Sequence, residues 1–191
     1  MPDRSAEYLA LIHISDLANL GPDPRPSRLP RNELESQLES WCASRSVSDD
    51  ARTVLLTAAL LWHDYLEDAH VLAQDIATTT GSFLHAIIHR REPDFNNACY
   101  WFHRVGRHEC FYAIARAATP FLVKHGEAQL ASRLLPNGLW NPFAFVEACA
   151  EVHRQAPAAP NPAILRQLQR IELESLATDL LSSPGATGRE P

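Results

Sequence analysis

The sequence lacks the features that would place it at a membrane or on nucleic acid. No apolar run reaches bilayer-spanning length, and the first residues lack the basic and apolar regions of a signal peptide. Acidic residues outnumber basic ones by 23 to 17, which argues against a nucleic-acid surface. We therefore expect neither a membrane nor a nucleic-acid partner.

Cysteine is scarce and scattered. The four cysteines form no C-x-x-C pair; they are Cys42, Cys99, Cys110 and Cys149. In a chain of this size, such cysteines are typical of buried thiols in a reducing compartment and not of a disulfide framework. A cytoplasmic protein with free cysteines is the expectation.

The alternation of apolar and polar residues that marks a half-buried strand is also absent. Apolar residues instead recur every three or four positions, which predicts helices over 5–20, 31–45, 49–75, 83–91, 95–105, 107–124, 142–155 and 162–182. We expect an all-α fold, a single-domain bundle of about seven or eight helices over residues 1–182. Residues 183–191 are expected to form a flexible C-terminal tail.

The predicted helix over 49–75 is apolar nearly all round in its first half, so we expect it to be the central helix of the domain. His63, Glu67 and His70 follow in its second half at spacings of four and three. Those spacings place the three side chains on one helix face, where they can line a cleft. The alternative is a partly solvated helix end with two surface histidines.

His85 and His89 lie four residues apart in H-A-I-I-H, the spacing used by many zinc-binding helices. Ala86 stands where H-E-x-x-H metalloproteases need their catalytic glutamate, which excludes that class. Helices joined by a short loop usually pack side by side. The predicted ligands of a divalent metal (zinc, iron, nickel or manganese) are therefore His63, His70, His85 and His89.

Charged and amide side chains follow in H-R-R-E-P-D-F-N-N. Arg90 and Arg91 can bind a carboxylate or phosphate through paired hydrogen bonds. The first turn of the helix predicted to begin at residue 95 also favours anions. We therefore expect a small anionic substrate. Glu92 and Asp94 can equally be salt-bridge partners of the arginines. Adjacent helical residues point about 100° apart, so one arginine should face the histidines and the other a structural carboxylate. The assigned catalytic residues are Glu67, Arg90 and Glu92, and the assigned substrate-binding residues are Arg91, Asp94, Asn97, Tyr100 and Trp101.

Two resemblances bear on this stretch. W-H-D-x-L-x-x-x-H followed by G-S-F-x-H-A-I-x-H-R-R-E-P-D-F-x-N-A-x-Y-W-F-x-R-V-G, over residues 61–111, resembles a family of uncharacterised bacterial and fungal proteins. That resemblance implies no activity, but it implies one shared site containing His63, His70, His85, His89, Arg90, Arg91, Glu92, Asp94, Asn97, Tyr100 and Trp101.

The second, shorter resemblance is to the H-D-x-x-E-D segment of HD-domain phosphohydrolases, carried by A-A-L-L-W-H-D-Y-L-E-D. It implies that His63 and Asp64 ligate one metal while Glu67 and Asp68 position water. The upstream metal-binding histidine of that family is missing. The segment E-D-A-H also matches the Glu-x-x-His element of di-iron bundles, but the sequence holds no second copy.

The predicted function is a metal-dependent enzyme, a hydrolase that acts on a small anionic molecule. The alternative is a non-catalytic helical protein in which the polar stretch binds a ligand or partner, or forms a buried hydrogen-bond network. If the histidines are ligands, their nitrogens should converge within about 3 to 4 Å. The other nitrogen of each ring should then meet a carboxylate or carbonyl, and one coordination position should stay open.

Overall fold

The structure, a computed structural model, describes residues 3–182. All regular structure in this range is helical, which confirms the all-α fold. The described residues form ten α-helices, more than the seven or eight expected. The predicted tail, 183–191, lies outside the described residues.

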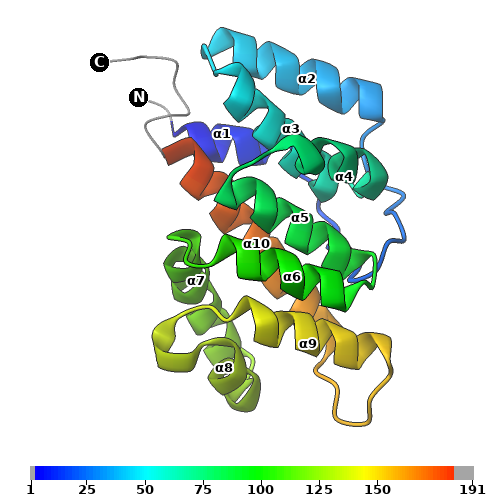
Figure 1. The fold of residues 1–191 in the computed structure, drawn as a ribbon, viewed down its shortest axis with the longest axis vertical. Helices are drawn as coiled ribbons and strands as arrows, with labels where there is room; N and C mark the ends of the chain where they lie inside the picture. The colour runs from blue at the N-terminus through cyan, green and yellow to red at the C-terminus, as the bar shows by residue number, and fades with distance from the viewer. Residues whose placement is uncertain (1–2, 183–191) are drawn as a thin grey trace.

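The helices are α1 (Arg4–Leu11), α2 (Arg31–Ser44), α3 (Asp49–Trp62), α4 (Leu66–Asp75), α5 (Thr79–Arg91), α6 (Phe95–Val105), α7 (Cys110–Lys124), α8 (Ala128–Leu134), α9 (Pro142–His153) and α10 (Pro162–Ser182), with a 3-10 turn at Pro136–Gly138. Helix α5 packs against α3, α4 and α6, while α9 packs on the far side of α6 (Figure 1). The long helix α10 runs behind them and contacts α1, α3, α7 and α9. No helix within 3–182 is both long and apolar enough to cross a membrane.

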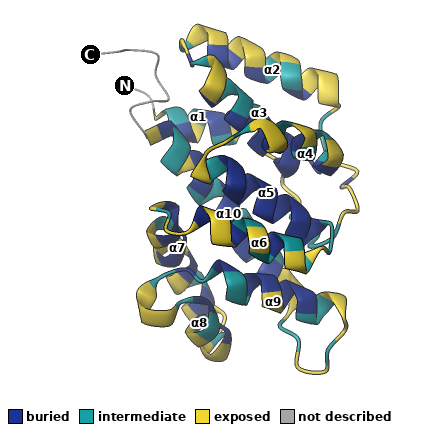
Figure 2. Cartoon of the chain, viewed as in Figure 1, coloured by how far each residue is buried: buried dark blue, intermediate teal, exposed yellow. Residues whose placement is uncertain are grey.

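The central helix is α5, not the helix expected over 49–75. Every α5 residue from Gly81 to Arg91 is buried (Figure 2). The helix begins where Thr78 Oγ1 accepts the Gly81 N–H at 3.0 Å, a side-chain N-cap. A Cβ at Gly81 would lie 2.3 Å from the Ile76 carbonyl oxygen, so only glycine lets the end of α4 approach α5 this closely.

The predicted helix over 49–75 is broken between Trp62 and Leu66. Asp64 adopts a left-handed conformation with φ of 63°, and the Tyr65 N–H donates to the Leu60 carbonyl at 2.9 Å. This is a Schellman ending, which normally uses glycine at the left-handed position. The single stripe expected from His63 to His70 therefore does not form.

Two further differences concern the connections. Helix α1 ends at Leu11 instead of residue 20, and 12–30 forms an irregular connection that returns across α10. Backbone carbonyls of this connection accept hydrogen bonds from α10 side chains, which offsets the loss of helical hydrogen bonds. Helix α8 was not predicted.

Candidate metal centre

Three histidines converge between α4 and α5. His70 comes from α4, while His85 and His89 lie one turn apart on α5. One ring nitrogen from each lies within 4.8 Å of the others, the only such group of possible metal ligands among residues 3–182. The Nε2 atoms of His70 and His85 are 2.8 Å apart. Three of the four predicted ligands thus lie together, although the spread is wider than the 3 to 4 Å expected of a loaded site.

Ring packing fixes the orientation of the three imidazoles. His70 meets His85 and His89 edge-on, with ring centroids 4.6 and 4.7 Å apart. His85 and His89 stack at 4.8 Å, and Trp101 of α6 stacks on His85 at 3.9 Å. Trp101, assigned to substrate binding from the sequence, here holds the plane of a histidine ring. Tyr100 packs edge-on against Trp101 and is 53% exposed.

The Glu92 carboxylate links two of the rings at their Nδ1 atoms. Its Oε1 lies 3.4 Å from His70 Nδ1, and its Oε2 lies 3.0 Å from His89 Nδ1. Such a carboxylate fixes which nitrogen carries the proton and leaves the other for a metal. Asn97, held at the start of α6 where Asp94 accepts its backbone N–H, places Nδ2 3.1 Å from His89 Nε2. Glu92 therefore orients two of the rings, whereas Asn97, positioned by Asp94, contacts the His89 nitrogen that a metal would use.

The buried histidines of the triad favour the neutral form. Burial, and then the neighbouring His70 and His89, lower the pKa of His85 to about 4. Burial likewise lowers the pKa of His89, although the Glu92 carboxylate opposes this. Neutral imidazoles keep the lone pair that a metal needs. His85 and His89 are only 3% and 5% exposed, so the opening to solvent lies beside the partly exposed His70.

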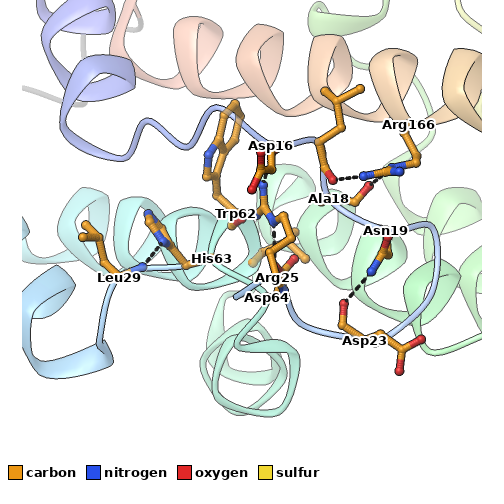
Figure 3. Close-up of polar contacts among 12 residues, drawn as sticks. Asp16, Ala18, Asn19, Asp23, Arg25, Leu29, Trp62, His63, Asp64 and Arg166 are labelled. Atoms are coloured by element: carbon orange, nitrogen blue, oxygen red, sulfur yellow. Dashed lines mark hydrogen bonds and ion pairs between the residues drawn. The ribbon is translucent and has the colours of Figure 1, made fainter. Parts of the chain in front are cut away.

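His63, the fourth predicted ligand, lies apart from the triad. The chain changes direction after Trp62, which leaves His63 fully buried at the end of α3. Its Nδ1 accepts the Leu29 N–H at 3.2 Å (Figure 3). Burial and the nearby Arg25 guanidinium lower the pKa of His63 to about 4. This histidine helps to hold the connection 12–30 in place.

The HD-like ligand pair is not formed either. The Asp64 carboxylate is buried and accepts from Arg25 Nε and Arg91 Nη2, each at 2.7 Å. Burial alone would raise the pKa of Asp64, but the two guanidinium groups hold it below its ordinary value. Asp68 pairs with Arg31 at 2.5 Å on the surface. Both oxygens of Asp64 are therefore engaged by arginines, and neither is free to serve as a metal ligand in this arrangement.

Neither arginine of the H-R-R sequence faces the triad, so the expected division of roles is wrong. Arg90 makes a two-pronged ion pair with Glu172 of α10, at 3.1 and 2.6 Å, and lies over the Phe145 ring. Arg91 pairs with Asp64 and donates to the Leu61 carbonyl at 3.0 Å. Because α5 is buried on all sides, both guanidinium groups need internal partners. The catalytic role of Arg90 and the substrate-binding role of Arg91 therefore find no support.

An open pocket of about 350 Å³ adjoins the triad at Glu92, and none of the three histidines lines it. Its walls include Glu92, the exposed Glu67 of α4, Tyr65 and Arg28. The Arg28 guanidinium lies 4.4 Å above the Tyr65 ring, and it has no carboxylate partner within residues 3–182. Arg28 was not among the site residues predicted from the sequence. A basic residue in the proline-rich connector was the one available signal.

Comparisons with known proteins provide no relative from which a function can be transferred. No family model, no curated protein and no solved structure matches the chain. A functional assignment therefore has the geometry of the described residues as its support.

Proposed function

We propose that His70, His85 and His89 bind a divalent transition metal, with zinc as the first candidate, in a hydrolase that acts on a small anionic molecule. The observation that carries this proposal is the convergence of the three imidazoles, two of them bound at Nδ1 by Glu92. Three protein ligands with a free fourth position make the ligand set of catalytic zinc. Iron, nickel and manganese are the alternatives.

A bound divalent ion lowers the pKa of coordinated water to about 7 and so supplies hydroxide at neutral pH. Glu92 favours the protons of His70 and His89 on Nδ1, so that Nε2 of each ring would be the ligand atom. The Asn97 amide, 3.1 Å from His89 Nε2, would have to turn away when the ion binds. Glu67 lies one turn before His70, lines the same pocket as Glu92, and has no ion pair within 3–182. We assign Glu67 the role of proton acceptor.

Arg28 is the group placed to hold an anionic substrate. Arg90 and Arg91 are committed to buried carboxylates, whereas the half-buried Arg28 lines the pocket that contains Glu67 and Glu92. A guanidinium group can bind a carboxylate or phosphate through two parallel hydrogen bonds. The proposal includes membership of the uncharacterised bacterial and fungal family, whose motif contains all three triad histidines.

A non-catalytic protein is the second candidate class. It is favoured by the hydrogen bond between His70 and His85 and by the stacking of Trp101 on His85, because these contacts hold the rings in place without an ion. In that case the triad is a buried polar network or a metal store.

Metal content is the first test of the proposal. The protein is produced without a histidine tag, incubated with zinc, dialysed and measured by inductively coupled plasma mass spectrometry. We expect about one zinc ion per chain, loss of the ion in the double variant His85→Ala/His89→Ala, and full retention in the control His13→Ala, which removes an exposed histidine. Absence of bound metal from the folded wild-type protein would overturn the proposal.

Hydrolysis is then measured on 4-nitrophenyl phosphate and 4-nitrophenyl acetate with zinc-loaded and chelator-treated protein. Zinc-dependent turnover that falls in Arg28→Met for the phosphate ester, but not for the neutral acetate ester, supports an anionic substrate. Bound zinc without turnover of either ester favours the non-catalytic class.

A further inference from the structure

The connection 12–30 covers one side of α10. Arg166 of α10 donates to the Ala18 carbonyl at 3.0 Å and also to the Leu17 carbonyl (Figure 3). Gln169, one turn further along α10, donates from Nε2 to the Asn19 carbonyl at 3.1 Å. These contacts hold the connection over α10 and create a seam between the two.

Two adjoining pockets lie along this seam. The inner pocket is narrow and partly open, with about 20 Å³ of free volume, room for a group the size of one water molecule. The outer pocket is open and holds about 530 Å³. Both are lined by Asp16, Leu17, Arg25 and Arg166, so they are contiguous. A small ligand can therefore place one small group in the inner pocket and the rest of its atoms in the outer one.

The inner pocket contains an acceptor that lacks a donor. Gln169 lines this pocket and is 1% exposed, and its Oε1 has no hydrogen-bond partner among the described residues. Since Nε2 is bound to the Asn19 carbonyl, the amide cannot be reversed without losing that bond. A buried acceptor without a donor is unfavourable, so the inner pocket favours a ligand group that donates a hydrogen bond.

The charged side chains around the seam favour a negatively charged ligand. Three arginines line the inner pocket, and two of them have carboxylate partners: Arg25 pairs with Asp64 and Arg170 pairs with Glu174. Arg166 has carbonyl partners and no carboxylate within 4.0 Å among residues 3–182. Asp16, the acidic residue that lines both pockets, is exposed to solvent and lies beyond ion-pair distance of all three arginines. A half-buried guanidinium without a counter-ion attracts an anion. Three guanidinium groups against one exposed carboxylate disfavour an ammonium group as the donor, so we take the donor to be a neutral hydroxyl.

We propose that the two pockets form a second site, distinct from the histidine triad, for a small 2-hydroxy carboxylate. Its hydroxyl donates to Gln169 Oε1 in the inner pocket. Its carboxylate accepts from Arg166 in the outer pocket, and its carbon skeleton lies against Leu17, which lines both pockets.

The test uses the full chain and three small probes of similar shape. L-Lactate carries both groups, propionate lacks the hydroxyl, and lactamide lacks the charge. Nuclear magnetic resonance follows the indole N–H of Trp62, which lines the inner pocket, with the signal assigned through Trp62→Phe. We expect lactate to give a saturable shift, with affinity at least about tenfold above that of either analogue, equivalent to about 1.4 kcal/mol.

Two variants test which group of the ligand each pocket residue binds. Gln169→Met should remove the preference for lactate over propionate, and Arg166→Met should remove the preference for lactate over lactamide. Arg107→Met, at an exposed residue away from both pockets, is the matched control and should change neither. Arg166 also holds the connection 12–30 against α10, so a melting curve of each variant checks that it is folded. The comparison of the three probes on wild-type protein does not depend on the folding of any variant.

Equal responses to lactate and propionate would mean that the inner pocket holds a water molecule only, and the proposal would be overturned. The same conclusion follows if no probe gives a saturable shift. Neither result depends on metal, so this site can fail while the metal centre stands, and the converse also holds.

Discussion

Arg91 and Asp64 form a fully buried ion pair, 2.7 Å from Nη2 to Oδ1, that joins the end of α5 to the break between α3 and α4. Arg25 adds a second guanidinium to the same carboxylate from the connection 12–30. One carboxylate thus holds three segments together, and it does so from a residue in a left-handed conformation. The position of α4, and with it His70, depends on this contact.

Replacing this carboxylate tests that dependence. Asp64→Asn keeps a side chain that tolerates the left-handed conformation, but it leaves two buried guanidinium groups without their counter-ion. We expect a loss of about 3 to 5 kcal/mol in the free energy of unfolding, measured by urea titration. Asp68→Asn, which removes a half-buried surface partner of Arg31, should cost at most about 1 kcal/mol. Similar losses for the two variants would contradict the role given to Asp64.

Gly81→Ala tests the close approach of α4 and α5. The added methyl group would lie 2.3 Å from the Ile76 carbonyl oxygen, so the end of α4 must move away from α5. We expect a loss of about 1 to 3 kcal/mol in thermal unfolding, together with weaker zinc binding because His70 moves with α4. In the control Gly21→Ala the new methyl group meets nothing within 4 Å. Unchanged zinc affinity in a destabilised Gly81→Ala protein would show that His70 keeps its place.

The helical fold and the histidine cluster could be predicted from the sequence, because both depend on local spacing. Periodicity located most helices, and H-A-I-I-H placed His85 and His89 on one face beside His70. The break at Asp64 was missed because no glycine marks the left-handed residue, and the cause lies in arginines far along the chain. The pairing of Arg90 was missed because its partner, Glu172, is 82 residues away. Long-range charge pairing leaves no periodic signal in the sequence.

His63 should make the protein sensitive to acid. Its pKa is about 4 in the folded chain and about 6.5 when unfolded, so both states are neutral above pH 6.5 and the group has no effect there. As the pH falls from 6.5 to about 4, the unfolded chain takes up a proton that the folded chain excludes, and stability falls by up to about 3 kcal/mol.

In His63→Asn the amide oxygen can accept the Leu29 N–H and cannot be protonated. The fall in free energy of unfolding between pH 7 and pH 4, measured by urea titration of metal-free protein, should therefore be smaller than in wild type. The exposed His13→Asn serves as the control and should keep the wild-type slope. An unchanged slope in His63→Asn would show that His63 is not the titrating group.

Glu92 and Glu67 should have separable roles, one positioning the metal ligands and the other acting on the substrate. Glu92 contacts His70 and His89 at Nδ1, whereas the exposed Glu67 lines the adjoining pocket and has no ion pair within residues 3–182. Loss of a carboxylate behind a ligating histidine typically weakens metal binding by about 10- to 100-fold. Loss of a general base typically lowers the rate by about 10²- to 10⁴-fold.

We therefore expect Glu92→Gln to weaken zinc affinity, measured by competition with a chromophoric chelator, by about 10- to 100-fold. Glu67→Gln should leave that affinity within about twofold, yet lower kcat on the hydrolysed ester at saturating zinc. Melting temperatures of both variants should stay close to wild type, because neither glutamate is buried. The two variants affect different measurements. An amide at position 92 accepts only one of the two Nδ1–H groups through its single oxygen, whereas an amide at position 67 cannot take a proton at all. If Glu67→Gln loses zinc and Glu92→Gln does not, Glu67 is a ligand, and the triad has a closed fourth position that is typical of a structural site.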